Sequence, residues 1–123
     1  QAPLVRSVLA CMQVLLLAQD ARAWTQSTQC TALLHQVIAL STDQRPKVRK
    51  RAHEAVRQVL THPPPPTSLH PASGACLEFS SRFFMNNRTS NKDERGARDT
   101  QTMHLLAFLR TILPGLNYFA YFQ

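Results

Sequence analysis

The chain has 123 residues, with 14 Lys and Arg against 7 Asp and Glu, and a formal net charge of +7. This length is enough to bury a real core, and the basic balance favours an acidic partner, such as nucleic-acid phosphate or an acidic protein tail. An enzyme is not expected, because the sequence has no phosphate-binding glycine loop, no Ser-His-Asp or Cys-His order and no paired acids in an apolar setting.

Neither a metal nor another cofactor is expected. The sequence has no CxxC pair, and its five histidines lack ligand spacing. Cys11, Cys30 and Cys76 each lie in a predicted helix among apolar neighbours, which favours buried, reduced thiols in an intracellular protein. The apolar run 14–18 is too short to span a bilayer, which takes about 20 residues. We therefore expect no membrane contact and no small-molecule substrate.

Apolar periodicity predicts five helices, of which the first two cover about residues 3–18 and 24–40. Apolar residues nearly surround the first helix, so we expect neighbours on two of its sides. Trp24 begins the second helix, and we interpret it as a packing residue rather than a binding aromatic. Ser41 and Thr42 form a short turn, so this helix and the next one make a helical hairpin.

The third helix, residues 46–60, is the one around which the chain is organised. Asp43 is an N-cap candidate, and Pro46 suits a first helical turn. From residue 45 to residue 57 there are six basic residues and one acidic residue, a net charge of +5. We predict that this basic side binds RNA or another acidic partner, although a solvated basic face is the alternative. The predicted binding residues are Arg45, Lys47, Lys50, Arg51 and Arg57.

Arg49 interrupts the apolar side of the same helix, where a charge needs a partner. Asp43, six residues earlier, is of the right type, so we predict a buried structural pair of Asp43 with Arg49. This Asp, Val-Arg and Ala pattern resembles the second helix of a HEAT repeat, in which the two residues form a ladder along the array. Val5-Arg6 supplies a second copy 43 residues before Val48-Arg49, within the HEAT period of about 40 to 47.

The rest of the chain is predicted as a proline-rich connector (61–71), a helix (72–85), a polar surface loop (86–98) and a last helix (99–113). Asp99 is the N-cap candidate of the last helix. The inward side of that helix should carry Met103, Leu105, Leu106, Leu109 and Ile112, with Met103 corresponding to Val48 at a separation of 55 residues.

The predicted fold class is all-α, an α-solenoid of HEAT-type helical hairpins. Residues 1–123 would form about two and a half repeats. Because the chain starts without methionine and ends on an aromatic stretch, we expect it to be a segment of a larger array.

Four separated motifs are similar to the ribosomal RNA processing protein 12 family. They are Pro3-Leu4-Val5-Arg6-Ser7, Ala18-Gln19-Asp20 followed by Trp24, Arg45-Pro46-Lys47-Val48-Arg49-Lys50, and Thr102-Met103-His104-Leu105-Leu106 with Pro114. The resemblance implies a non-catalytic HEAT-repeat scaffold of the nucleolus and nucleus. Its partners would be precursor ribosomal RNA and assembly factors in small-subunit pre-ribosomes, and it would assist rRNA maturation and nuclear export.

Two other functions remain open. A nuclear transport receptor is also a HEAT solenoid, but such receptors bind basic cargo through acidic inner helices, and here the second helix of the hairpin is basic. A general protein-interaction scaffold would use the same positive charges to dock acidic tails.

Overall fold

The computed structural model describes residues 1–86 and 92–113, and these contain no β-strand. The all-α prediction is confirmed. The α-helices are Ala2–Leu17 (α1), Ala21–Gln26 (α2), Thr28–Ala39 (α3), Pro46–Leu60 (α4), Ser73–Asn86 (α5) and Lys92–Ile112 (α6), and a 3₁₀ turn, Leu40–Thr42 (η1), joins α3 to the loop before α4.

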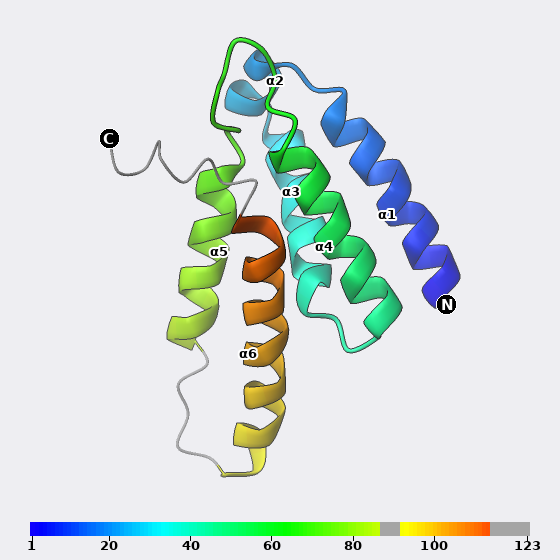
Figure 1. Cartoon of the computed structure of the whole chain (residues 1–123), viewed down its shortest axis with the longest axis vertical. Helices are drawn as coiled ribbons and strands as arrows, with labels where there is room; N and C mark the ends of the chain where they lie inside the picture. Colours follow the sequence, from blue (N-terminus) through cyan, green and yellow to red (C-terminus); the bar gives the residue numbers. More distant parts are fainter. Residues whose placement is uncertain (87–91, 114–123) are drawn as a thin grey trace.

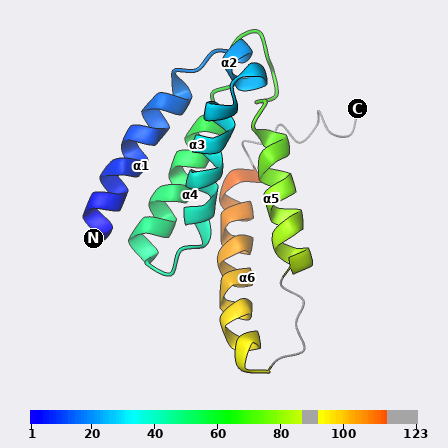
Figure 2. The same cartoon turned by 180° about the vertical axis from the view of Figure 1, so that it is seen from behind.

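The helices form two layers, as a helical solenoid does (Figures 1 and 2). One layer is a row in which α4 lies between α1 and α6 and contacts both. In the other layer α3 packs against α4 and α1, and α5 contacts α3. The hairpin of α3 and α4 is thus one repeat, α1 is the second helix of the repeat before it, and α5 with α6 forms the repeat after it.

A repeated burial pattern sets the register of the row. Each of its three helices buries apolar residues at positions i, i+3 and i+7. The residues are Leu9, Met12 and Leu16 in α1, Ala52, Ala55 and Val59 in α4, and Leu105, Phe108 and Ile112 in α6. The first separation is 43 residues, as the Val5-Arg6 and Val48-Arg49 copies predict.

The second separation is 53 residues, so the predicted match of Met103 with Val48 is wrong. Val48 is fully buried, whereas Met103 is 64% exposed and Leu106 is also exposed. Residues inserted between α4 and α6 lengthen this separation beyond 43 residues, so the sequence period does not reveal it. Only the packing of α6 against α4 defines the 53-residue register.

Two predicted helix boundaries are also wrong. The expected helix 24–40 is divided at Ser27, whose extended backbone ends α2 and whose hydroxyl accepts a hydrogen bond from the Cys30 amide. The last helix begins at Lys92 rather than at Asp99, so residues 92–98 are helical instead of a loop. Residues 87–91 of the predicted loop and the aromatic stretch after Leu113 lie outside the described residues.

The first helix is covered less completely than its composition predicts. Leu9, Met12 and Leu16 face the interior, but Leu4, Val8 and Leu15 are exposed. Cys11 is exposed too, which corrects the expectation of three buried thiols, whereas Cys30 and Cys76 are buried and unpaired. Burial raises the pKa of the Cys76 thiol to about 12, so this side chain is an unreactive part of the core.

Residues 61–72 link α4 to α5 without regular secondary structure, and this segment is anchored on α2. The His70 ring meets the Trp24 ring edge-on with centroids 4.6 Å apart, and both side chains are buried. His70 Nδ1 accepts a hydrogen bond of 2.9 Å from the Ala72 amide. Trp24 is therefore a packing residue, as predicted.

This anchor predicts a pH dependence of stability. Burial lowers the pKa of His70 to about 4, against about 6.5 in an unfolded chain. Between these values the unfolded state binds the proton and the folded state does not, so stability falls as the pH drops from about 6.5 to about 4. The expected loss is about 3 kcal/mol, since each pKa unit corresponds to about 1.4 kcal/mol. His70→Asn keeps an acceptor for the Ala72 amide without titrating, and should flatten the curve of unfolding free energy against pH; His62→Asn, on an exposed histidine, should not.

Candidate nucleic-acid interface

Helix α4 carries the predicted basic side, and its neighbours decide which residues remain accessible. The His53 ring lies against Phe108 of α6, with ring centroids 5.4 Å apart, so the side of α4 that holds Arg49 and His53 faces α6. At 100° per residue, the opposite side faces α1 and includes Arg51 and Gln58, which are half-buried. Lys47, Lys50 and Arg57 lie between these two sides, toward the solvent.

Arg57 is already paired within its own helix. Its Nε and Nη2 atoms donate to the two Glu54 carboxylate oxygens at 3.0 and 2.6 Å, and Gln58 donates to the same carboxylate at 2.9 Å. These hydrogen bonds, with Arg57 first, lower the pKa of Glu54 to about 2. Both groups of the pair are ionised at neutral pH, so together they add little net charge to the solvent side of α4.

Arg45 is paired in the same way, just before the helix begins. Its Nε and Nη2 atoms donate to the two carboxylate oxygens of Asp43 at 2.9 and 3.0 Å, and its amide donates to Asp43 Oδ1. The hydrogen bonds from Arg45 lower the pKa of the Asp43 carboxyl group. Of the five predicted binding residues, two are therefore held in local ion pairs.

The other three predicted binding residues keep their positive charge unpaired. Lys47 and Lys50 are exposed and make no ion pair with any described residue. Arg51 is half-buried, and its Nη1 atom is enclosed without a hydrogen-bond partner in the described part of the chain. We define Lys47, Lys50 and Arg51 as the basic strip of α4.

The predicted ion pair of Asp43 with Arg49 is not formed. Arg49 Nη1 instead donates to the backbone carbonyls of Asp43 and Gln44, at 2.9 and 3.4 Å. The carboxylate of Asp43 is engaged by Arg45, and only a weaker charge attraction links it to Arg49. Arg49 therefore holds the backbone of the turn before α4, and this fixes the direction in which the helix starts.

Two histidines extend this contact between α4, the turn and α6. His53 hydrogen-bonds through Nε2 with the Ser41 carbonyl, 2.7 Å away, and His104 lies on α6, which packs against the η1 turn. Burial, together with the Arg49 charge, lowers the pKa of both imidazoles, so both are neutral at neutral pH. Residues 41–44 are thus contacted by side chains of two neighbouring repeats.

One cationic residue near the strip was missed at the sequence level. Arg110 of α6 is exposed, and the 53-residue register gives it the position that Arg57 has in α4. The wrong register of 55 residues hid this correspondence. The exposed side of the row therefore carries positive charge on two successive helices.

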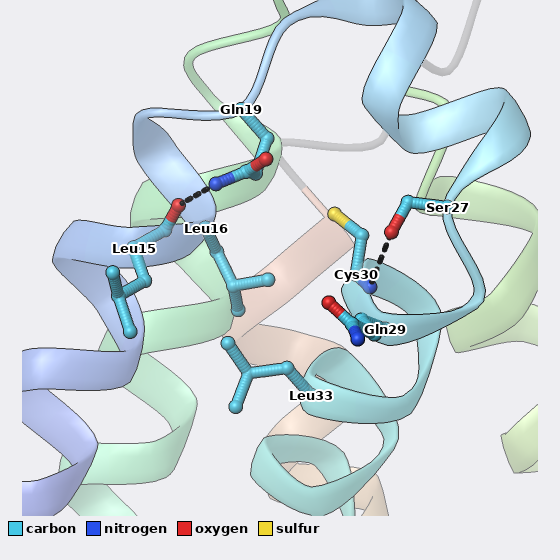
Figure 3. Close-up of a pocket in the computed structure, with 7 residues that line it drawn as sticks. All are labelled: Leu15, Leu16, Gln19, Ser27, Gln29, Cys30 and Leu33. Carbon is cyan, nitrogen blue, oxygen red and sulfur yellow. Dashed lines mark hydrogen bonds between the residues drawn. The ribbon is translucent and has the colours of Figure 1, made fainter.

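Two cavities lie between helices of the described part of the chain. A cleft of about 480 Å³ between α4 and α6 is lined by Gln44, Pro46, Arg49, Thr100, Gln101 and His104. A smaller hollow of about 170 Å³ lies between α1 and α3 and is lined by leucines, amides, Ser27 and Cys30 (Figure 3). Burial raises the pKa of Cys30, which disfavours the nucleophilic thiolate.

Within the described residues, no group of three or more His, Cys, Asp or Glu side chains is placed to bind a metal ion. None of the described helices has both the length and the apolar character needed to cross a membrane.

Stacked helical hairpins with a basic strip on the exposed side of the row define a helical-repeat protein of the HEAT type. The family described as RRP12-like, N-terminal HEAT repeats matches residues 1–118. The chain belongs to this family.

Two relatives agree with this assignment. The chain is 43% identical over 83 residues to Ribosomal RNA-processing protein 12 of Saccharomyces cerevisiae. This alignment covers 63% of the chain and 7% of the yeast protein. It is 27% identical over 110 residues to the RRP12-like protein of Homo sapiens, covering 89% of the chain and 8% of the human protein. The chain thus spans less than a tenth of either relative. No solved structure matches it significantly.

Proposed function

We propose that this chain is part of a non-catalytic HEAT-repeat scaffold of ribosome biogenesis. The observation that carries the proposal is the 43% identity to a yeast protein named for ribosomal RNA processing. We further propose that the scaffold associates with small-subunit pre-ribosomal particles in the nucleolus and nucleus, where it assists rRNA maturation and nuclear export. Its partners would be precursor rRNA and assembly factors.

The contact that we propose for this segment is between the basic strip of α4 and RNA phosphates. Lys47 and Lys50 support it, because they are exposed and unpaired among the described residues, and Arg51 adds a third charge. Arg45 and Arg57 should contribute less, since a contact with phosphate would have to compete with Asp43 and Glu54. Phosphate contacts of this kind give salt-dependent affinity without reading the base sequence.

Charge reversal of the two lysines tests the contact. We expect Lys47→Glu/Lys50→Glu to weaken binding of a fluorescent single-stranded RNA roughly tenfold and to reduce the slope of log affinity against log salt by about two. The matched control is Arg22→Glu/Arg82→Glu, which changes the net charge equally on exposed residues of α2 and α5. Equal losses in the two variants would mean that only overall charge matters, and would contradict a contact at the strip.

Ultraviolet crosslinking of the full-length protein in cells separates RNA from a protein partner. RNA-crosslinked peptides covering residues 45–57, with precursor rRNA attached, are the expected result. Loss of an acidic assembly factor from the double lysine variant, without any RNA crosslink at 45–57, would favour the protein-docking alternative instead.

A further inference from the structure

The cleft between α4 and α6 is formed by two successive repeats. One wall comes from the start of α4 and the turn before it, and the other comes from residues 100–104 of α6. The two helices lie side by side and run in the same direction (Figures 1 and 2). The cleft volume of about 480 Å³ lies within the range of roughly 300–1,000 Å³ that is typical of small-ligand pockets. It is therefore large enough to hold a nucleobase.

The lining of the cleft offers both hydrogen-bond donors and acceptors, and none of its six residues is acidic. Gln44 is exposed and Gln101 is half-buried, and each side-chain amide carries a donor and an acceptor. The two amides come from opposite walls. His104 adds an imidazole whose Nδ1 atom is enclosed without a hydrogen-bond partner in the described part of the chain. Buried polar atoms without a partner are uncommon, so this one favours a contact with a ligand.

Arg49 supplies the permanent positive charge of the cleft. Its Nη1 atom donates to the backbone carbonyls of Asp43 and Gln44, so the guanidinium has a fixed position on the α4 wall. A planar guanidinium stacks on aromatic faces, including those of unpaired bases. The Arg49 side chain therefore offers a base both a flat surface and a charge.

The cleft adjoins the basic strip of α4. Lys47 directly follows Pro46, and Lys50 directly follows Arg49, so two residues that line the cleft each precede an exposed lysine of the strip. A strand whose phosphates contact the strip has its bases beside the cleft. A carboxylate ligand would need donors only, whereas the edge of a base displays donors and acceptors together, as the amides of the cleft do. The lining thus favours a base over an acidic side chain.

We propose that the cleft between α4 and α6 binds one unpaired base of the RNA whose phosphates contact the basic strip. The inference rests on the proposed RNA contact and adds recognition of a base to it. Gln44 and Gln101 would hydrogen-bond to the base edge from the two walls, and the Arg49 guanidinium would pack on the base. The RNA must be single-stranded at this point, because a base in a duplex is already paired and stacked.

Removal of the two amides from the full-length protein tests the site without changing its charge. We expect Gln44→Ala/Gln101→Ala to bind a fluorescent single-stranded RNA about tenfold more weakly than the wild type, with the same slope of log affinity against log salt. Its affinity for an abasic strand of equal length, which keeps every phosphate, should not change. The matched control is Gln29→Ala/Gln36→Ala, at two exposed glutamines of α3, which should bind both strands as the wild type does.

The possible outcomes separate the cleft from the strip. If the wild type bound neither strand, the proposed RNA contact itself would be wrong, and the base site with it. If the amide variant lost equal affinity for both strands, or lost none, the strip contact would stand and the base site would be contradicted. Weaker binding of a glutamate-rich peptide by this variant, with RNA binding unchanged, would assign the cleft to an acidic protein segment and overturn the proposal.

Crosslinking of the full-length protein to thiouridine-substituted RNA locates the base directly. Thiouridine reacts through its base, so we expect crosslinks in residues 99–110, the tryptic peptide that carries Gln101 and His104. The Gln44→Ala/Gln101→Ala variant should lose most of these crosslinks. RNA-bound protein without a crosslink in this peptide would overturn the proposal.

Discussion

Phe108→Ala is expected to lower the free energy of unfolding by about 4 kcal/mol, the largest single effect that the packing predicts. Phe108 is the largest fully buried side chain among the described residues, and it joins α6 to α4 through the His53 ring. Removing the ring leaves a cavity between two repeats. Because α6 has fewer contacts with α4 than α1 has, little other packing would compensate for the loss.

The matched control is Leu106→Ala in the same helix, at an exposed position. Its expected cost is below about 1 kcal/mol, as for most surface substitutions. Urea denaturation followed by circular dichroism measures both variants. Similar costs for the two substitutions would contradict the burial of Phe108 and the exposure of Leu106, and would favour the arrangement predicted from the sequence, in which Leu106 is an inward residue.

Arg49→Ala is expected to cost about 3 kcal/mol. The guanidinium donates to the carbonyls of Asp43 and Gln44, and hydrogen bonds to charged groups contribute about 1.5–3 kcal/mol each. Without the side chain the partly buried Asp43 carbonyl loses its partner, and the turn before α4 loses its anchor. Arg49→Lys should recover only part of the stability, because one ammonium group does not reproduce the planar guanidinium.

A comparison with Asp43→Asn distinguishes this backbone contact from a carboxylate ladder. The amide keeps an oxygen acceptor for the Arg45 amide and loses only the exposed ion pair with Arg45, so the expected cost is below about 1 kcal/mol. Thermal unfolding of the two single variants gives both values. If Asp43→Asn were as destabilising as Arg49→Ala, the carboxylate would be the functional partner of Arg49.

Several features of the fold were predictable because they depend on local chemistry. The start of α4 at Pro46 follows from the fixed backbone angle of proline, and its end near Leu60 follows from the prolines that come after it. The 43-residue repeat was detectable because α1 and α4 share both a Val-Arg pair and the spacing of their buried residues. The end of α2 at Ser27 was missed, since a serine within an apolar pattern is compatible with both a helix interior and a cap.

The sequence by itself determined the all-helical class, the repeat architecture and the excess of basic residues in α4, because helix periodicity, turn residues and charge are properties of the chain alone. Only the tertiary structure decided which charges remain available. Asp43 and Glu54 pair with Arg45 and Arg57 because the helix start and the i+3 spacing bring them within 3 Å, which leaves the basic strip of Lys47, Lys50 and Arg51. Packing likewise set the register of α6 and left Leu4, Val8 and Leu15 of α1 exposed among the described residues, since burial depends on contacts between segments that are distant in the sequence.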